Sequence, residues 1–319
     1  MTDSALEHPS PLESATLCIT VCTRQRPKML AHLIESYRSL HIPQGVTVSL
    51  EIVENDTSPR VESMIRSLPP VTDRPVCYHF EPRLGIPFAR NRCIAIAVTR
   101  GASHIAFIDD DEWFTDHWLE TIWRYSEQQQ HQAVIQGTVL SALDGDIPSY
   151  FQSFFQRSIP ATGSTRNMCI TNNLLVPMTV FVEHPFRFDE SRPFAGGTDS
   201  KLFRQLHQHG VALINCAEAI MYERVTADRA NYRWLTKRYF RIGLTLGEHR
   251  DASGSLTKLR FCTKRLLSAA KHALKAVLYL VSGRPQKRLK SWLKAAKTAG
   301  VALGIYHVHV DAYRHIEGE

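Results

Sequence analysis

The sequence predicts an α/β fold in which a mainly parallel central sheet has helices on both faces. Through the first 140 residues, short apolar runs of strand type alternate with segments of helical periodicity, the pattern of parallel-sheet domains. Polar clusters follow three of these runs, at residues 23–26, 54–57 and 109–112. The carboxyl ends of parallel strands meet at one edge of a sheet, where ligands bind, so we expect these clusters to converge.

Each expected element has a local reason in the chain. The first strand, at 16–22, is a compact apolar run, and Pro27 suits the start of a helix at 28–40. A Gly-Gly turn at 196–197 precedes a helix at 199–209. Further strands are expected at 46–53, 76–80, 104–108, 133–140 and 168–176, and further helices at 61–68, 87–99 and 116–128. Residues 141–167 are expected to be irregular.

Four consecutive acidic residues, 109–112, follow the buried-type strand at 104–108. Like charges this close repel, and at least one pKa is disturbed unless a cation neutralises them. A hard divalent ion with oxygen ligands, Mg²⁺ or Mn²⁺, does this. The alternative is a solvated acidic turn that caps the next helix. The sequence contains no GxxxxGK[ST], and no GxGxxG follows a strand, which argues against a P-loop and the usual dinucleotide fold.

Several segments match the motifs of one family in order and spacing. FIDDDE (107–112) resembles its DxD motif, and EPRLGIPFARNRCIA (81–95) resembles its x-G-x-x-x-A-R-N segment. Further matches are CITVCTRQRP (18–27), EIVENDTS (51–58), TNNLLVP (171–177) and GGTDSKLFRQLHQHG (196–210). Together they resemble glycosyltransferase family 2, whose enzymes have the GT-A fold. MYERVTADRANYRWLTKRYFRIG (221–243) resembles the branch associated with bacterial exopolysaccharide and lipopolysaccharide assembly.

The resemblance implies a catalytic base and a metal site. Asp199 is implied as the base that deprotonates the acceptor hydroxyl. Asp111 is implied as the main ligand of a divalent metal, Mn²⁺ or Mg²⁺, with Asp109 on the metal or the ribose. Glu223 stands where related enzymes often carry a metal-binding His. A metal would act as a Lewis acid on the leaving diphosphate, and one base with in-line attack implies inversion at the anomeric carbon.

The resemblance also implies a donor site. Thr23 and Glu54, with Asp56 nearby, are implied to line the nucleoside pocket, and Arg90 to contact the nucleotide. The other motif residues expected at the substrate site are Arg26, Asn173 and Gly197.

Two residues depart from the family pattern. Glu54 replaces the usual Asp and reaches one methylene further. Thr198 replaces the Glu of the usual Glu-Asp pair, which leaves Asp199 as the only carboxylate of that pair. An alternative function is therefore a catalytically weakened, anionic-lipid-tethered subunit that binds sugar nucleotides.

The net charge of +7 hides an uneven distribution of charge. Residues 224–300 hold 19 Lys and Arg against three Asp and Glu, a net of +16, whereas residues 1–223 have a net of −7. Within this block, Lys264, Lys271 and Lys275 lie opposite a leucine-rich helical face, and a second such pattern spans 287–297. Basic amphipathic helices of this kind are typical of an element lying on an anionic membrane, although two ordinary packed helices give the same pattern. No spacing of aromatic residues suggests a nucleic-acid platform.

The remaining features favour a location in the cytoplasm, peripheral on the inner face of the membrane. The seven cysteines form no CxxC pair, which favours free thiols, and the N-terminus shows no signal-peptide pattern. We expect a polar tail (1–15), a GT-A catalytic domain (16–250) and a basic amphipathic extension (251–319). The predicted function is an inverting, metal-dependent transferase that moves a sugar from a nucleotide-sugar donor, UDP-linked by preference, to a saccharide or glycolipid acceptor.

Overall fold

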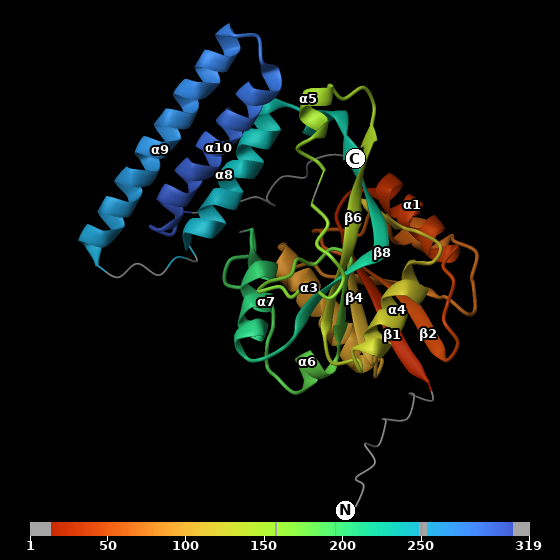
Figure 1. Cartoon of the computed structure of the whole chain (residues 1–319). Coiled ribbons are helices and arrows are strands. Elements are labelled where there is room, and N and C mark those ends of the chain that lie inside the picture. Colours follow the sequence, from red (N-terminus) through yellow and green to blue (C-terminus); the bar gives the residue numbers. More distant parts are fainter. Residues whose placement is uncertain (1–13, 157, 195, 249, 251–253, 309–319) are drawn as a thin grey trace, which may run out of the picture.

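The centre of the molecule is an eight-stranded sheet in the order β3-β2-β1-β4-β7-β6-β8-β5 (Figure 1). The computed structural model describes residues 14–156, 158–194, 196–248, 250 and 254–308. The strands are β1 (Ala15–Thr23), β2 (Val46–Glu54), β3 (Val76–Phe80), β4 (His104–Asp109), β5 (Glu112–Phe114), β6 (Val134–Asp144), β7 (Leu174–Pro177) and β8 (Leu213–Thr226). Four neighbouring pairs are parallel and three are antiparallel, which confirms the predicted, mainly parallel α/β sheet.

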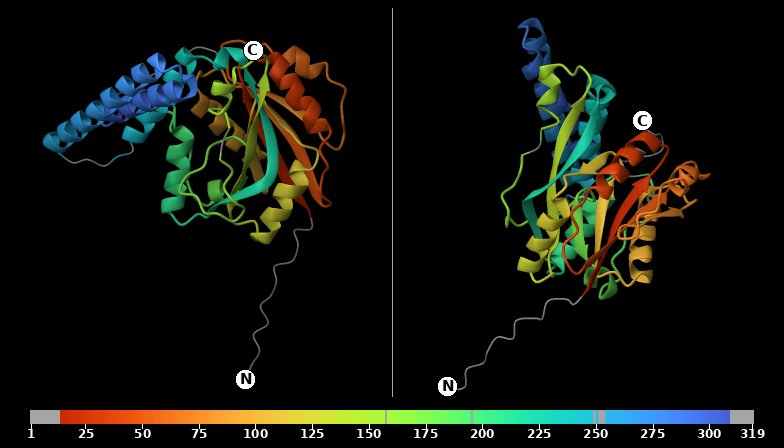
Figure 2. Two further views of the ribbon diagram at one scale, coloured as in Figure 1. Left: turned by 45° about the horizontal axis from the view of Figure 1, so that its top comes forward. Right: turned by 90° about the vertical axis from the view of Figure 1, so that its right-hand side faces the viewer.

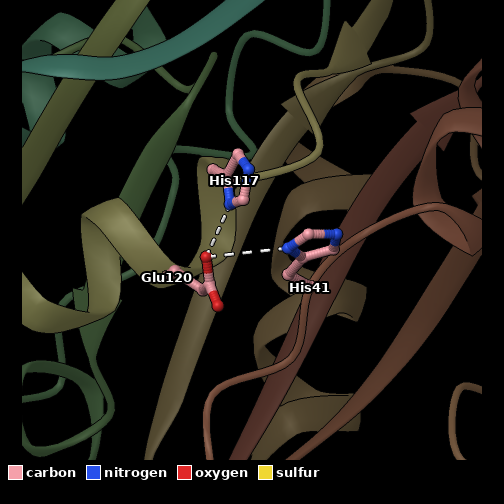
Figure 3. A group of neighbouring side chains, drawn as sticks. All are labelled: His41, His117 and Glu120. Atoms are coloured by element: carbon pink, nitrogen blue, oxygen red, sulfur yellow. Dashed lines mark hydrogen bonds and ion pairs between the residues drawn. The ribbon is translucent and has the colours of Figure 1, made fainter.

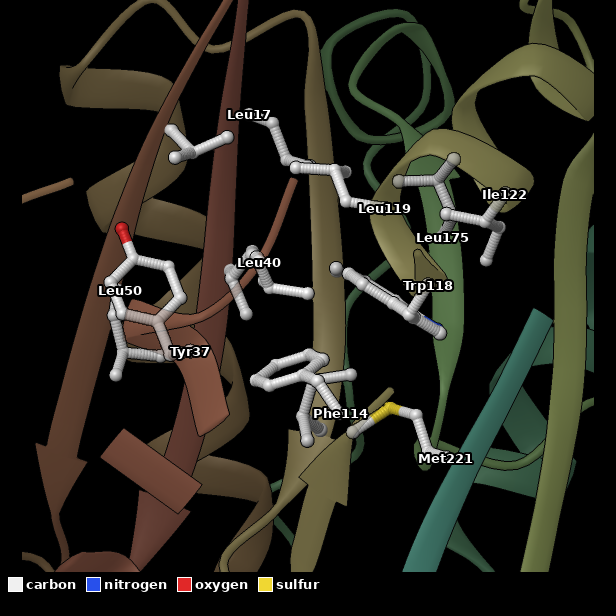
Figure 4. Packing of buried hydrophobic residues seen from close by; sticks show 14 of the residues in the cluster. Leu17, Tyr37, Leu40, Leu50, Phe114, Trp118, Leu119, Ile122, Leu175 and Met221 are labelled. Carbon is white, nitrogen blue, oxygen red and sulfur yellow. The ribbon is translucent and has the colours of Figure 1, made fainter. Parts of the chain in front are cut away.

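Helices cover both faces of the sheet, as predicted. One face carries α1 (Pro27–Arg38), α2 (Glu62–Arg66) and α4 (Trp118–Gln128). The other carries α3 (Ile86–Thr99), α6 (Thr179–Val182) and α7 (Thr198–Gln208). Successive side chains of β1 serve the two cores in turn, with Leu17 and Ile19 in the first and Cys18 in the second. Figure 4 shows the first core, in which side chains of α1, α4 and the sheet pack together.

Four strands differ from the sequence prediction. The short strand β5 was not predicted, and β6 runs on to Asp144, into the segment 141–167 that we expected to be irregular. β7 begins at Leu174 instead of 168, because Asn173 has a φ of 45°, a left-handed conformation that cannot continue a strand. β8 runs through 14 residues that we did not predict as a strand, and polar residues such as Asn215 and Glu218 interrupt its apolar pattern. β8 lies between β6 and the short strand β5, and so carries Glu223 to the sheet edge beside the acidic residues.

The chain ends in three helices, α8 (Tyr232–Glu248), α9 (Ser255–Val281) and α10 (Pro285–Gly304), which stand away from the sheet (Figures 1 and 2). α8 falls before the predicted start of the extension at 251, yet it packs closely on α10. A Cβ added at Gly243 of α8 would meet the carbonyl oxygen of Lys297 and lie 2.9 Å from Cα of Gly300, both on α10. A third apolar cluster, which includes Val225 and Leu289, joins these helices to the end of β8. Of the predicted tail and extension, residues 1–13, 251–253 and 309–319 lie outside the described residues.

The two basic helices bury their apolar residues differently. In α10, Leu289 and Leu293 are fully buried within the molecule. In α9, the buried residues are Cys262, Ala269 and Ala276, spaced seven apart, and the leucine-rich face is exposed. No helix in the described part of the chain is long and apolar enough to cross a bilayer.

Candidate active site

A cleft of about 590 Å³ opens where β1 and β4 end. The parallel register pairs Thr23 with Glu54 and Cys22 with Asp109, so three strands end at the same level. The predicted convergence of the polar clusters at this edge is therefore confirmed. Eight residues singled out from the sequence line the cleft, namely Thr23, Arg26, Arg90, Asp109, Asp111, Gly197, Asp199 and Glu223.

Asp110 ties the first and fourth strands together at the floor of the cleft. The Thr23 hydroxyl donates to one of its carboxylate oxygens at 2.8 Å, and an Arg26 guanidinium nitrogen donates to the other at 2.8 Å. Sequence reasoning did not single out this residue, and its only signal was its place in the run of four acids. Both oxygens of Asp110 thus accept from Thr23 and Arg26, and fix their side chains.

Asp109 lies in a strongly perturbed environment. Burial raises the pKa of its carboxyl group to about 7; Arg90 opposes the shift, and the neighbouring charges of Asp111, Asp110 and Asp199 add to it. Asp109, at the end of β4, and Asp199, in the first turn of α7, line the same cleft.

The carboxylate of Asp111 contacts arginines on two sides. Arg229, which ends the short 3₁₀ turn after β8 (Ala227–Arg229), donates to Oδ2 at 2.9 Å, and Arg26 lies 3.7 Å from the same oxygen. Glu223 stands opposite Glu112 across β5 and β8, and accepts a hydrogen bond from the Ser141 hydroxyl at 2.8 Å.

A divalent cation in the cleft stays a prediction, because the carboxylate oxygens of Asp109, Asp111 and Glu223 are not gathered within 4.8 Å of one another. Asp109, Asp111 and Glu223 bring carboxylate oxygens to one cleft, which is the ligand type that Mg²⁺ and Mn²⁺ prefer. Glu112, buried behind them, has one carboxylate oxygen with no hydrogen-bond partner among the described residues, and burial raises its pKa well above the ordinary value. The carboxylates share the cleft with seven arginines, namely Arg24, Arg26, Arg90, Arg204, Arg229, Arg238 and Arg241.

Asp199 lies in the first turn of α7, where its carboxylate accepts the backbone N–H of Ser200 at 2.8 Å. The preceding Gly197 has a φ of 86°, and a Cβ there would lie 2.6 Å from a methyl carbon of Thr245 on α8. Glycine thus allows α7 to begin against α8 with Asp199 in the cleft. Thr198, which replaces the family's Glu, is buried.

Three of the residues expected at the substrate site do not line the cleft. The Glu54 carboxylate accepts hydrogen bonds from the backbone of Arg60 and Val61 and from the Tyr78 hydroxyl. The buried Asp56 carboxylate accepts hydrogen bonds from the Gln25 amide and the backbone N–H of Thr57, and forms ion pairs with two arginines. Burial alone would raise the pKa of this carboxyl group, but these contacts outweigh it and hold the pKa below the ordinary value.

Asn173 is the third. It is fully buried, donates to the carbonyl oxygens of Thr138 and Ala219 at 2.8 Å, and accepts from the Trp118 indole at 2.7 Å. All its side-chain contacts thus lie inside the fold. The motif residue that lines the cleft next to Glu54 is Asn55. Its side-chain amide donates a hydrogen bond to the carbonyl oxygen of Arg83 and accepts one from the N–H of Gly85, in the loop that precedes α3.

One wall of the cleft was not foreseen. α8 contributes one helical face to it, made of Trp234, Arg238, Arg241, Ile242, Thr245 and Leu246. Ile242 and Leu246 remain about 40% exposed (39% and 42%). The sequence showed that this region is basic and that residues 221–243 resemble one branch of the family. It did not place α8 at the cleft, because that position depends on packing against α10.

The family model described as Glycosyl transferase family 2 matches residues 18–181, which include Arg90 and the acidic residues 109–112. The chain belongs to this family. The resemblance found in the sequence is thereby confirmed, and the protein is a glycosyltransferase by family.

Relatives extend the match along nearly the whole chain. The succinoglycan biosynthesis protein ExoM of Rhizobium meliloti (strain 1021) is 29% identical over 301 residues, 92% of this chain and 94% of ExoM. Among solved structures, S. aureus TarS 1–349 in complex with UDP-GlcNAc matches with a TM-score of 0.53 at 10% identity, over 88% of this chain and 90% of that one. The complex of the same fragment with UDP has a TM-score of 0.51 at 12% identity. A longer TarS structure is matched over 55% of its length. These matches confirm the predicted GT-A fold.

Proposed function

We propose that this glycosyltransferase moves a sugar from a nucleoside-diphosphate donor to a hydroxyl group of a lipid-linked saccharide or glycolipid, with inversion at the anomeric carbon, in surface-polysaccharide assembly. The single observation that carries the proposal is the cleft, in which Asp199 lies together with Asp109 and Asp111, with arginines beside them. The volume of about 590 Å³ is of the size that small-molecule sites have. The similarity to ExoM, a succinoglycan biosynthesis protein, and to TarS, solved in complex with UDP-GlcNAc, supports polysaccharide assembly and a UDP-linked donor.

The strand ends form the donor side of the cleft. Arg26 and Arg90 place positive charge beside the acidic residues, where a diphosphate would otherwise be repelled. Asp111, Asp109 and Glu223 are the residues that would hold Mn²⁺ or Mg²⁺, which supplies Lewis-acid stabilisation of the leaving diphosphate. Thr23 is fixed by Asp110 and lines the floor on which the nucleoside would rest.

Asp199 is the proposed general base. It lines the cleft at the start of α7, where it can take the proton of an acceptor hydroxyl that attacks the anomeric carbon. A single base with direct displacement predicts inversion. The α8 wall combines Arg238 and Arg241 with Ile242 and Leu246, which suits an acceptor that has anionic and apolar parts.

α9 supports a site of action at the inner face of the cytoplasmic membrane. Its exposed apolar residues form one stripe, here named the α9 stripe: Leu256, Leu259, Leu266, Leu267, Leu274, Val277, Leu278 and Val281. One edge of the stripe carries the exposed basic residues Arg260, Lys264, Lys271 and Lys275, which therefore border the leucine-rich face and do not lie opposite it as predicted. An exposed apolar surface with a basic border is the arrangement of helices that lie in a membrane interface.

The experiment that tests the donor proposal is calorimetric titration of UDP into the full chain with and without Mn²⁺. Binding should need Mn²⁺, and Asp111→Asn should abolish the metal-dependent part. Asp146→Asn, which removes an exposed carboxylate outside the cleft, is the matched control and should bind like wild type. Unchanged affinity in excess chelator would contradict the metal-dependent donor site.

A second measurement in the same samples separates the enzyme from the weakened binding subunit that Thr198 suggested. An active transferase should hydrolyse a bound UDP-sugar slowly without an acceptor, whereas a binding subunit should hold it intact.

A further inference from the structure

A second group of metal-ligating side chains lies on the surface, outside the cleft. His41, His117 and Glu120 each offer one ligand atom, and these atoms all lie within 4.8 Å of one another (Figure 3). None of the three lines the cleft. Neither the family resemblance nor the proposed reaction uses them.

The fold builds this group from two distant segments. His41 lies in the loop between α1 and β2, whereas His117 directly precedes α4 and Glu120 lies in its first turn. The backbone N–H of His41 donates to the carbonyl oxygen of Asp116 at 2.9 Å, which pins the loop to the start of the helix. Residues three apart on a helix share a face, so His117 and Glu120 point the same way.

The distances suit one small cation. His117 Nδ1 lies 2.7 Å and His41 Nδ1 3.8 Å from the same oxygen of Glu120, and the two imidazole rings are 4.4 Å apart. In a tetrahedral zinc site with bonds of about 2.0–2.2 Å, neighbouring ligand atoms lie about 3.3 Å apart. The observed pair of distances brackets that value, and all three side chains are exposed and can adjust.

The ligand chemistry favours zinc over the hard ions proposed for the cleft. Two imidazoles and one carboxylate form a typical three-ligand zinc set, with water in the fourth position. The exposed carboxylate of Glu120 supplies the oxygen ligand of this set, and one ring nitrogen of each histidine lies beside it. Near pH 7.5 most imidazoles are neutral and able to ligate.

We propose that His41, His117 and Glu120 bind one Zn²⁺ ion that fastens the loop after α1 to the start of α4. α4 follows β5, and β5 follows directly on the acidic residues of the cleft. The ion is separate from the divalent ion of the active site, and the proposal is independent of the proposed reaction. It braces the segment that carries the acidic motif.

The test is calorimetric titration of ZnCl₂ into the full chain at pH 7.5 in excess Mg²⁺, which saturates oxygen sites but binds imidazole weakly. We expect one equivalent of Zn²⁺ to bind, and at least tenfold weaker binding in His41→Gln and in His117→Gln. Co²⁺ in place of Zn²⁺ should give a tetrahedral visible spectrum that the same variants lose. His207→Gln removes an exposed histidine elsewhere on the surface and is the matched control.

Thermal unfolding gives a readout that does not depend on activity. Zn²⁺ should raise the unfolding temperature of wild type and of His207→Gln, but not that of the two ligand variants, because only a ligand of the folded state stabilises it. Equal Zn²⁺ affinity in wild type and in both ligand variants would overturn the proposal, as would binding without any rise in the unfolding temperature.

Discussion

At the scale of single residues, the placement of Asp199 is the most informative feature of the cleft. Its carboxylate stands at the start of α7 and interacts electrostatically with Asp109, while the residue before it, Thr198, is buried and carries no charge. Among the described residues, five acidic groups line the cleft: Asp199 at the start of α7, Asp109, Asp110 and Asp111 in the run at the end of β4, and Glu223 on β8. This asymmetry fits a base on the acceptor side and a cation on the donor side.

We predict that Asp199→Asn lowers turnover about 10²- to 10⁴-fold, because it removes the base and keeps the size of the side chain. Affinity for UDP with Mn²⁺ should stay near that of wild type. Turnover is measured by steady-state sugar transfer, or by slow donor hydrolysis, and UDP affinity is measured by calorimetry.

The control is the double variant that combines Thr198→Glu with Asp199→Asn, in which turnover should not be restored. If the turnover of Asp199→Asn lies within threefold of wild type, with chemistry shown to be rate-limiting, Asp199 is not the base, and Glu223 is the next carboxylate of the cleft to test.

The side chain of Asn173 stabilises the fold and does not line the substrate cleft. Replacement by Ala would leave two buried carbonyl oxygens and the Trp118 indole without their partner. We predict that Asn173→Ala lowers the free energy of unfolding by about 2–4 kcal/mol, since each unsatisfied buried group costs about 1–3 kcal/mol. Denaturant unfolding measures this free energy.

The matched control is Asn172→Ala. The Asn172 side-chain oxygen has no hydrogen-bond partner among the described residues, so the free energy of unfolding of this variant should change little. Comparable losses in both variants would contradict this role.

Residue type and spacing predicted most of the site, because carboxylates and arginines at strand ends must meet at one sheet edge. They could not predict where each side chain turns. Glu54 ends its strand level with Thr23, yet its carboxylate binds the backbone of the following loop. Asp110, between two predicted ligands, is the carboxylate that Thr23 and Arg26 hold. Such choices depend on which neighbour offers a donor, and a linear pattern does not contain that information.

At the scale of elements, long periodic segments were predictable and irregular pairings were not. β1, α1 and β3 lie where their apolar patterns placed them. β8 was missed because its alternation is broken, and β5 because three residues carry no periodicity. The close approach of α8 and α10 was also not predictable. A glycine within a helix lowers helix propensity, and its sequence position does not show which other helix packs against it.

A substitution at Gly243 tests the close contact between α8 and α10. Ala is about 1 kcal/mol better than Gly in an open helix, so Gly243→Ala should stabilise the protein if nothing touches the site. We predict the opposite sign, because the new methyl group would meet the Lys297 carbonyl oxygen and would lie 2.9 Å from Gly300 Cα. A lower unfolding temperature and faster proteolysis within 232–308 should result. Gly196→Ala is the control, because nothing lies within 4 Å of its added Cβ, and its stability should match wild type. A Gly243→Ala protein more stable than wild type would refute the close contact.

At the scale of the whole molecule, charge and apolar surface are divided between two parts. The sheet and its helices are acidic overall, and the basic residues gather on the last three helices. The sequence offered two explanations for the basic helices, a membrane surface or ordinary packing. α10 is packed by its leucines, whereas the α9 stripe is exposed and bordered by cations. Because α8 of the same unit lines the cleft, a membrane bound at α9 would lie on the same part of the molecule as the proposed acceptor wall.

The α9 stripe leads to a prediction that separates burial of apolar side chains from charge attraction. Leu267→Glu and Thr257→Glu each lower the net charge of α9 by one, and both positions are exposed. Only Leu267 lies in the stripe. Burying a leucine side chain contributes about 1.5–3 kcal/mol, so Leu267→Glu should weaken binding to anionic vesicles about tenfold or more, beyond the small loss that Thr257→Glu shows. Co-sedimentation of the full chain with anionic and with neutral vesicles measures the binding of both variants.

Binding of wild type should favour anionic vesicles and weaken as the salt concentration rises, because the attraction is screened over about 10 Å at 0.1 M. If the two variants lose binding equally, charge alone holds the protein and the stripe does not enter the membrane; if wild type binds neutral and anionic vesicles alike, the basic border plays no part.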